Sequence, residues 1–245
     1  METNNSFDKT LAVFLAKICI QTYNQYTYDG SFDIPDGYTL VEGFKAIAIN
    51  RPEWFGFIIK SSDNIVVAFR GTQSEIDWLA NADAYQTRYS FAPGSGKIHR
   101  GFLDIYKSCR EQIITTLLSL PASSNIYITG HSLGAALAVI NALDIAANTC
   151  FKPVMYNFAC PRIGNPIFAF KYNRLVTNSI RIVNEHDLVP KLPPVIILAP
   201  MPCRILVYQH VKEIYKISFQ ANSIKGNHDI SNYLDALANQ FNSPE

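Results

Sequence analysis

The segment 125–138, NIYITGHSLGAALA, holds the residue types best suited to covalent chemistry. It contains a Gly-x-Ser-x-Gly pattern centred on Ser132, with a β-branched run before Gly130 and a helix of small residues after Gly134. A strand–turn–helix of this kind is typical of a nucleophile elbow, where the serine backbone is strained and its neighbours two positions away must be tiny. The helix N-terminus that follows directs backbone amides toward the serine and favours a developing negative charge. The alternative is an ordinary helix-capping serine, and the context favours the nucleophile.

A serine nucleophile needs a base, and the base needs a carboxylate to orient it. In α/β hydrolases the acid and then the base follow the nucleophile along the chain. Asp187 lies just after the strand-like run SIRIV, at a strand end of the kind that carries sites in open α/β sheets. We take Asp187 as the acid and Glu185 as second choice, and we interpret Asp144, in mid-helix, as a solvated charge.

Five histidines compete for the role of base. His99 precedes the nucleophile, His131 adjoins it and cannot easily fold back, and His186 is the direct neighbour of the candidate acid. The residues alone leave His210, in a strand-like run, and His228, in a turn before the last helix. We favour His228 because loops on rigid scaffolds often carry catalytic groups.

Hydrophobic periodicity predicts the elements that must position these side chains. Expected strands are 38–49, 54–60, 64–69, 125–129, 154–158 and 179–183, with two strand-like runs in 204–218. Expected helices are 101–120, 133–147, 166–174 and 231–241. A first helix is expected within 1–20, where Leu11, Phe14, Leu15 and Ile18 recur at helical spacing. Thr22, just beyond this range, continues the same spacing. Strands alternating with helices indicate an α/β fold with a mostly parallel central sheet and helices on both faces. The early pair of strands, separated by a turn at 50–52, suggests an antiparallel edge.

Composition excludes several classes of protein. The chain has 245 residues, 48% hydrophobic and 17% charged, with a formal net charge of +1. This composition is unlike a disordered chain, and the charge offers no basic excess for a nucleic-acid partner. We expect one domain over 1–245. No apolar stretch approaches a membrane span and no signal peptide is evident, so we expect a cytoplasmic protein, or a secreted one whose leader is absent from this chain.

The five cysteines are widely spaced and include no Cys-x-x-Cys pair. A thiolate metal site is therefore not indicated, and we expect buried free thiols, with one disulfide left open if the protein is exported.

Taken together, the motifs resemble the class 3 lipases, the fungal-type branch of the α/β-hydrolase fold. The resemblance is carried by collinear segments at 67–72 (VAFRGT), 98–102 (IHRGF), 130–137 (GHSLGAAL), 161–165 (PRIGN), 183–190 (VNEHDLVP) and 228–233 (HDISNY). It implies Ser132, Asp187 and His228 as a catalytic triad, and no metal or organic cofactor. The secreted fungal members carry leaders and disulfides that this chain does not show, which leaves the compartment open.

The resemblance also implies how substrate is held. The backbone amides of Leu133 and Thr72 would form an oxyanion hole. A lid region over about 73–92 would follow, with Ile76, Trp78 and Leu79 among its substrate-contacting residues. The alternative is that Trp78 is fixed core and the site is always open. The apolar run 192–201 is expected on the rim of an acyl groove.

The implied function is serine-dependent hydrolysis of carboxylic esters, with triacylglycerols and related lipids as substrates. The expected partners are that lipid and, transiently, a lipid–water interface. Alternatives are a non-lipid esterase of aryl or feruloyl type, or a phospholipase, of the same fold. A non-catalytic binding member of the fold is the remote alternative, which the intact Ser–Asp–His order disfavours.

Overall fold

The computed structural model describes residues 7–48, 50–72, 85–199 and 204–239. Its strands are β1 (Thr39–Ile47), β2 (Pro52–Lys60), β3 (Asn64–Phe69), β4 (Gln86–Arg88), β5 (Lys97–His99), β6 (Asn125–His131), β7 (Pro153–Phe158), β8 (Asn178–Asn184), β9 (Ile196–Ala199), β10 (Arg204–Val207) and β11 (Ile214–Ile217). Its helices are α1 (Lys9–Thr27), α3 (Arg100–Leu118), α4 (Leu133–Asn148), α5 (Pro166–Leu175), α6 (Ile224–His228) and α7 (Ile230–Asn239), with one 3-10 turn, η1 (Val189–Lys191).

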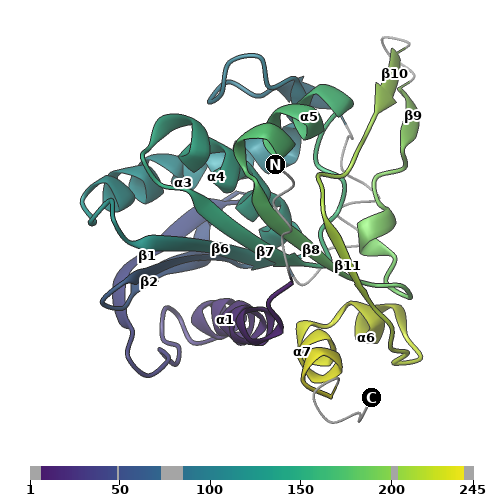
Figure 1. Cartoon of the computed structure of the whole chain (residues 1–245). Coiled ribbons are helices and arrows are strands. Elements are labelled where there is room, and N and C mark those ends of the chain that lie inside the picture. Colours follow the sequence, from purple (N-terminus) through teal and green to yellow (C-terminus); the bar gives the residue numbers. More distant parts are fainter. Residues whose placement is uncertain (1–6, 49, 73–84, 200–203, 240–245) are drawn as a thin grey trace.

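A seven-stranded sheet in the order β1-β2-β3-β6-β7-β8-β11 forms the centre of the protein (Figure 1). Strands β1, β2 and β3 pair antiparallel, whereas β3, β6, β7, β8 and β11 run parallel. The mostly parallel sheet with an antiparallel edge confirms the expectation from sequence. Parallel strands end at one edge of a sheet, so the segments after β3, β6 and β8 lie close together there.

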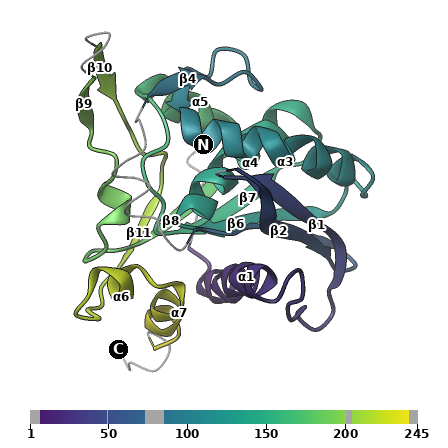
Figure 2. The same cartoon turned by 180° about the vertical axis from the view of Figure 1, so that it is seen from behind.

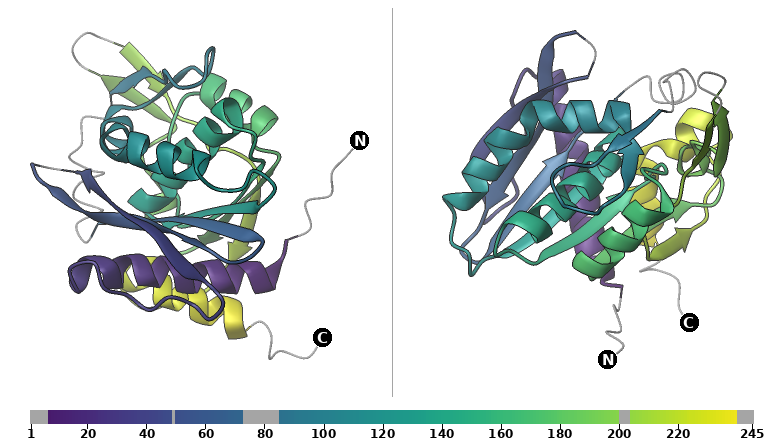
Figure 3. Two further views of the ribbon diagram at one scale, coloured as in Figure 1. Left: turned by 90° about the vertical axis from the view of Figure 1, so that its left-hand side faces the viewer. Right: turned by 90° about the horizontal axis from the view of Figure 1, so that it is seen from above.

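Helices cover both faces of the sheet, α3, α4 and α5 on one side and α1 and α7 on the other (Figures 2 and 3). Two apolar cores result. The larger lies under α3, α4 and α5, and α4 contributes a helix that is buried almost all round. The smaller lies under α1 and α7, which pack against each other.

The first helix runs from Lys9 to Thr27 and so continues beyond the range 1–20 in which it was expected. Leu15, Ile18 and Thr22 face the core as its spacing suggested, while Leu11 and Phe14 are only partly buried. Asp8 caps the helix by accepting a hydrogen bond from the backbone N–H of Leu11 at 2.9 Å, as short polar side chains do at this position.

Two small ribbons lie outside the central sheet, and of their strands only β10 falls within the expected strand-like runs of 204–218. One is β4–β5, and the other is β9–β10, which stands away from the body beside α5 (Figure 1). The first of these corrects the extent of the expected lid region. Tyr89 and Ala92 were placed in that region, but both are buried in the larger core, and the Tyr89 hydroxyl donates to the carbonyl of Ile140 at 3.1 Å. Residues 85–92 are thus part of the scaffold.

Candidate active site

Ser132 occupies the sharp turn between β6 and α4. Its backbone has φ 56° and ψ −120°, a conformation that costs a non-glycine residue energy and persists only where the surroundings enforce it. A Cβ on Gly130 would lie 2.3 Å from the carbonyl oxygen of Gly134, and one on Gly134 would lie 2.3 Å from that of Phe69. Both glycines are therefore required for the turn to pack.

The Ser132 side chain does not cap the helix it precedes. Its Oγ lies 2.8 Å from Nε2 of His228, and Nδ1 of His228 lies 2.7 Å from Oδ2 of Asp187. All three residues are buried, with exposed fractions of 0%, 7% and 1%. The geometry is that of a hydroxyl poised to give its proton to an imidazole whose other nitrogen is oriented by a carboxylate.

Asp187 is fixed by two further donors. The backbone N–H of Val189 donates to Oδ1 at 2.9 Å, and the Tyr233 hydroxyl donates to Oδ2 at 2.7 Å. The same hydroxyl accepts the backbone N–H of Asn184 at 3.0 Å, so α7 is tied to the end of β8. Burial, and then the nearby Asp187 charge, raise the pKa of Tyr233 well above its ordinary value, so the phenol keeps its proton and remains a donor. Sequence analysis gave Tyr233 no role beyond its place in the expected last helix, 231–241, and in the segment 228–233.

His228 is also held through its main chain. Nε2 of His131 lies 2.7 Å from the carbonyl oxygen of His228, and Nδ1 of His131 lies 2.7 Å from the Tyr23 hydroxyl. A carbonyl only accepts, so Nε2 of His131 carries the proton, and in the neutral ring the Tyr23 hydroxyl donates to Nδ1. This connection joins α1, β6 and the candidate base. Sequence analysis discarded His131 as a base and missed this role, for which the only signal was its position beside the nucleophile.

The expected oxyanion residues lie next to the elbow. Leu133 is the first residue of α4, where helix amides have no acceptor within the helix. Thr72 follows β3, and the close approach of Gly134 to the Phe69 carbonyl brings the start of α4 against the end of that strand. The Thr72 hydroxyl oxygen is buried and has no hydrogen-bond partner among the described residues. Both predicted donors are thus in the neighbourhood of Ser132.

The predicted lid residues Ile76, Trp78 and Leu79 lie outside the described residues.

The rival candidates lie elsewhere. His210 is held by a 2.8 Å contact between its Nε2 and the carbonyl of Pro190, and Glu185 is exposed and pairs with Lys216 at 3.4 Å. His186, expected to have no catalytic role, contacts Ser218 and Gln220 near the surface. Of the alternatives that the sequence left open, the structure brings His228 and Asp187 together with Ser132.

The interpretation of Asp144 as a solvated charge is wrong. Its side chain is fully buried and binds Arg110 through both oxygens, at 2.5 and 3.0 Å. Tyr106 donates to it at 2.7 Å and Asn148 at 2.6 Å. The helix α4 is buried nearly all round, so a charge on any of its faces needs internal partners.

Three thiols, those of Cys19, Cys109 and Cys160, are free and buried, and burial raises the pKa of each to about 12. Cys150 is free and exposed, and Cys203 lies outside the described residues. Across the described ranges, no three His, Cys, Asp or Glu side chains are grouped as a metal site would require, and no helix is long and apolar enough to span a membrane.

Comparison with known proteins shows the family to which the chain belongs. Residues 66–196 match the family described as lipase (class 3). A chloroplastic phospholipase A1 of Arabidopsis thaliana is 30% identical over 76% of this chain and 48% of its own length, and a lipase of Rhizomucor miehei is 37% identical over 55% and 39%. The structure of a triacylglycerol lipase, described as having a serine protease triad as its catalytic centre, superposes with a TM-score of 0.71 at 25% identity, over 85% of this chain and 79% of that one.

The chain spans about half the length of the first curated relatives it matches. The match to the family covers more than half of the chain itself and includes Ser132 and Asp187, whereas His228 lies beyond it. The chain therefore belongs to the class 3 lipase family and has its α/β-hydrolase fold.

Proposed function

We propose that this protein hydrolyses carboxylic esters of lipids through a covalent acyl-enzyme on Ser132. The observation that carries the proposal is the continuous contact from Ser132 Oγ through His228 to Asp187, with distances of 2.8 and 2.7 Å. Such a chain is what converts a serine hydroxyl into a nucleophile.

The reaction proceeds in two steps. His228 accepts the Ser132 proton as Oγ attacks the ester carbonyl, and the amides of Leu133 and Thr72 stabilise the negative oxygen that forms. His228 then gives the proton to the departing alcohol, and a water activated by the same imidazole releases the acid. Asp187 keeps the imidazole in the correct tautomer and stabilises its charged form. The buried Thr72 hydroxyl adds a further donor, which supports the oxyanion assignment. Losing one oxyanion donor costs about 10²–10³ in turnover.

Ser132 has no exposed surface, so a substrate carbonyl reaches it only after part of the chain moves. The lid expected from the resemblance would provide this movement. If activity on a short triacylglycerol shows no rise when the substrate passes its solubility limit, the assignment of a mobile lid fails.

The test of the reaction is the Ser132→Ala variant. It should keep the fold, lose esterase activity by roughly 10⁴-fold or more, and no longer react with a fluorophosphonate probe. The control is Ser90→Ala, a change at an exposed serine outside the site, which should leave probe labelling intact. Full activity in Ser132→Ala would overturn the mechanism.

The choice of lipid is tested separately. The relatives reported above are named a phospholipase A1 and a lipase, so a panel should compare a triacylglycerol, phosphatidylcholine and a feruloyl ester. Preference for the feruloyl ester would contradict the proposed lipid class while leaving the mechanism in place.

A further inference from the structure

The charges of this chain are divided unevenly along the sequence. Three segments, 85–103, 145–184 and 188–212, contain no Asp or Glu, yet they hold 11 of the 21 Lys and Arg residues. All 20 acidic residues lie outside them. The net charge of +1 is therefore the sum of a basic part and an acidic part of the sequence.

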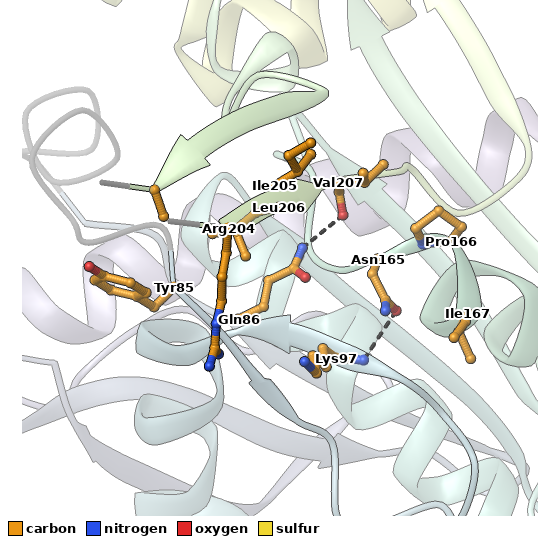
Figure 4. Close-up of a pocket in the computed structure, with 11 residues that line it drawn as sticks. Tyr85, Gln86, Lys97, Asn165, Pro166, Ile167, Arg204, Ile205, Leu206 and Val207 are labelled. Carbon is orange, nitrogen blue, oxygen red and sulfur yellow. Dashed lines mark hydrogen bonds between the residues drawn. The ribbon is translucent and has the colours of Figure 1, made fainter. Parts of the chain in front are cut away.

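The fold brings the three segments together around one groove of about 630 Å³. Its walls are β4, β5, the start of α5, and the ribbon β9–β10, and every lining residue belongs to an acid-free segment (Figure 4). Side chains fix the walls to one another. The Gln86 amide donates to the carbonyl of Val207 at 2.8 Å, and Asn165 accepts the backbone N–H of Lys97 at 3.1 Å.

Two cationic side chains line this groove, Lys97 from β5 and Arg204 from β10, and Figure 4 shows Arg204 extending toward the β4–β5 ribbon. A third, Arg88, stands directly opposite Lys97 in the β4–β5 ladder. Like charges placed opposite each other in this way are destabilising. Within the described ranges no carboxylate forms an ion pair with any of the three. An anion would relieve this repulsion.

One face of the β9–β10 ribbon is aliphatic. Leu198 and Ile205 stand opposite each other in the ladder and are 74% and 69% exposed, and Ile196, two residues before Leu198, is 62% exposed. Residues that alternate along a strand share a face, so these three side chains form one patch on a ribbon that stands out from the body (Figures 1 and 2). Clustered exposed aliphatic side chains mark an interaction surface.

We propose that the groove and the aliphatic face of the β9–β10 ribbon form a docking surface for a bilayer of anionic phospholipid. The aliphatic side chains enter the acyl region, and Lys97, Arg204 and Arg88 bind headgroup phosphates. A cation near a negatively charged bilayer and an apolar face at its boundary each favour this occupant. The ribbon follows closely on the loop that holds Asp187, where Val189 N–H binds that carboxylate. Docking there brings the catalytic edge of the sheet toward lipid. The proposal goes beyond ester hydrolysis and does not depend on it.

The test measures co-sedimentation of the full chain carrying Ser132→Ala with two kinds of vesicle, phosphatidylcholine alone and phosphatidylcholine mixed with phosphatidylglycerol. The protein should bind the mixed vesicles more tightly, and salt should reduce the difference. Each cation near the surface contributes about fivefold in affinity. The double variant Lys97→Gln/Arg204→Gln should therefore bind the mixed vesicles about 25-fold more weakly.

The matched control is Lys17→Gln/Lys60→Gln, which removes the same charge from exposed positions on α1 and β2. It should change binding by no more than about twofold. A third variant, Leu198→Ser/Ile205→Ser, should weaken binding to both kinds of vesicle. Urea unfolding midpoints should not fall in any of the three, since the replaced side chains are exposed or line an open groove, and Lys97→Gln removes the repulsion with Arg88.

Equal losses in the two charge variants would show that only net charge matters and would overturn the proposal. Absence of binding to mixed vesicles by the parent protein would overturn it as well, in favour of an acidic protein partner. Every sample carries Ser132→Ala, so vesicle binding is measured without catalysis. A failure of the docking proposal is therefore distinct from a failure of the proposed hydrolysis, which is tested by comparing the esterase activity of Ser132→Ala with that of the unsubstituted protein.

Discussion

Replacing His131 with phenylalanine tests whether His131 positions the candidate base, His228, through its main-chain carbonyl. His131 donates from Nε2 to the main-chain carbonyl of His228 at 2.7 Å, and its Nδ1 contacts the Tyr23 hydroxyl, also at 2.7 Å. His131→Phe keeps a planar ring in a buried place and removes both contacts. The substituted side chain therefore differs from the original chiefly in its hydrogen bonds.

The size of the effect follows from the bond that is lost. A hydrogen bond contributes about 1 kcal/mol net, and a buried group left without its partner costs about 1–3 kcal/mol. If that cost appears as displacement of His228 from Ser132, and each 1.4 kcal/mol is a factor of ten, kcat should fall about ten- to a hundredfold. KM for a soluble short-chain ester should change little, because His131 acts through the His228 main chain.

The assay is kcat and KM on a soluble nitrophenyl ester, together with the rate of fluorophosphonate labelling of Ser132. His131→Gln restores an N–H donor at about the reach of Nε2 and should recover part of kcat. Tyr23→Phe, which leaves the bond to His228 in place, should lose less than His131→Phe. The reasoning is refuted if His131→Phe turns over as fast as the parent, or if the Phe and Gln variants are equally impaired.

Three further predictions follow from groups away from the triad. Gly134→Ala would place a Cβ 2.3 Å from a backbone carbonyl at the end of β3, so it should lower the free energy of unfolding by about 1–3 kcal/mol and slow probe labelling. Arg110→Met should leave the buried Asp144 carboxylate without a cation and cost about 3 kcal/mol in urea unfolding; a loss below about 1 kcal/mol would show that Asp144 does not need the pair. Burial lowers the pKa of His99 to about 4, and burial and then the Arg181 charge lower that of His210 to about 3, from an ordinary 6.5. The unfolded chain thus binds protons that the folded protein does not, so stability should be complete above pH 6.5 and fall as the pH drops toward 4. A urea midpoint that stays constant over that range, or a His210→Gln variant with an unchanged slope, would contradict this.

The elements and the family could be predicted from sequence because their signals are local. Strand β3 has the predicted bounds, and the helix after Ser132 begins at the predicted residue. The strained turn at Ser132 was also foreseeable, since Gly130 and Gly134 are needed at its two flanks and the pattern shows both. The order of acid and base along the chain then reduced the candidates to a few residues. Their catalytic roles remain a proposal.

Contacts between residues far apart in the chain could not be predicted from the sequence pattern. His210 and His228 both follow Asp187, and only the folded chain shows that one meets Ser132 while the other meets a proline carbonyl. Tyr233 reaches Asp187 from 46 residues away. Asp144 was misjudged because the sequence shows a charge in mid-helix but not that α3 brings Arg110 against it.

The charge distribution shows most clearly which properties of the protein can be predicted from the sequence and which depend on the fold. A formal charge of +1 excludes a protein that binds polyanions by its total charge. It says nothing about local fields, because a bilayer responds only to charges within about one Debye length of its surface, roughly 10 Å. The acid-free segments can be read from the sequence, but they are separated by 41 residues in one place and by three in another. Their meeting around Lys97 and Arg204 is a property of the topology, since β5, α5 and β10 become neighbours only when the parallel sheet has formed. A chain of near-zero net charge can therefore form a groove whose lining includes Lys97 and Arg204 and no acidic residue.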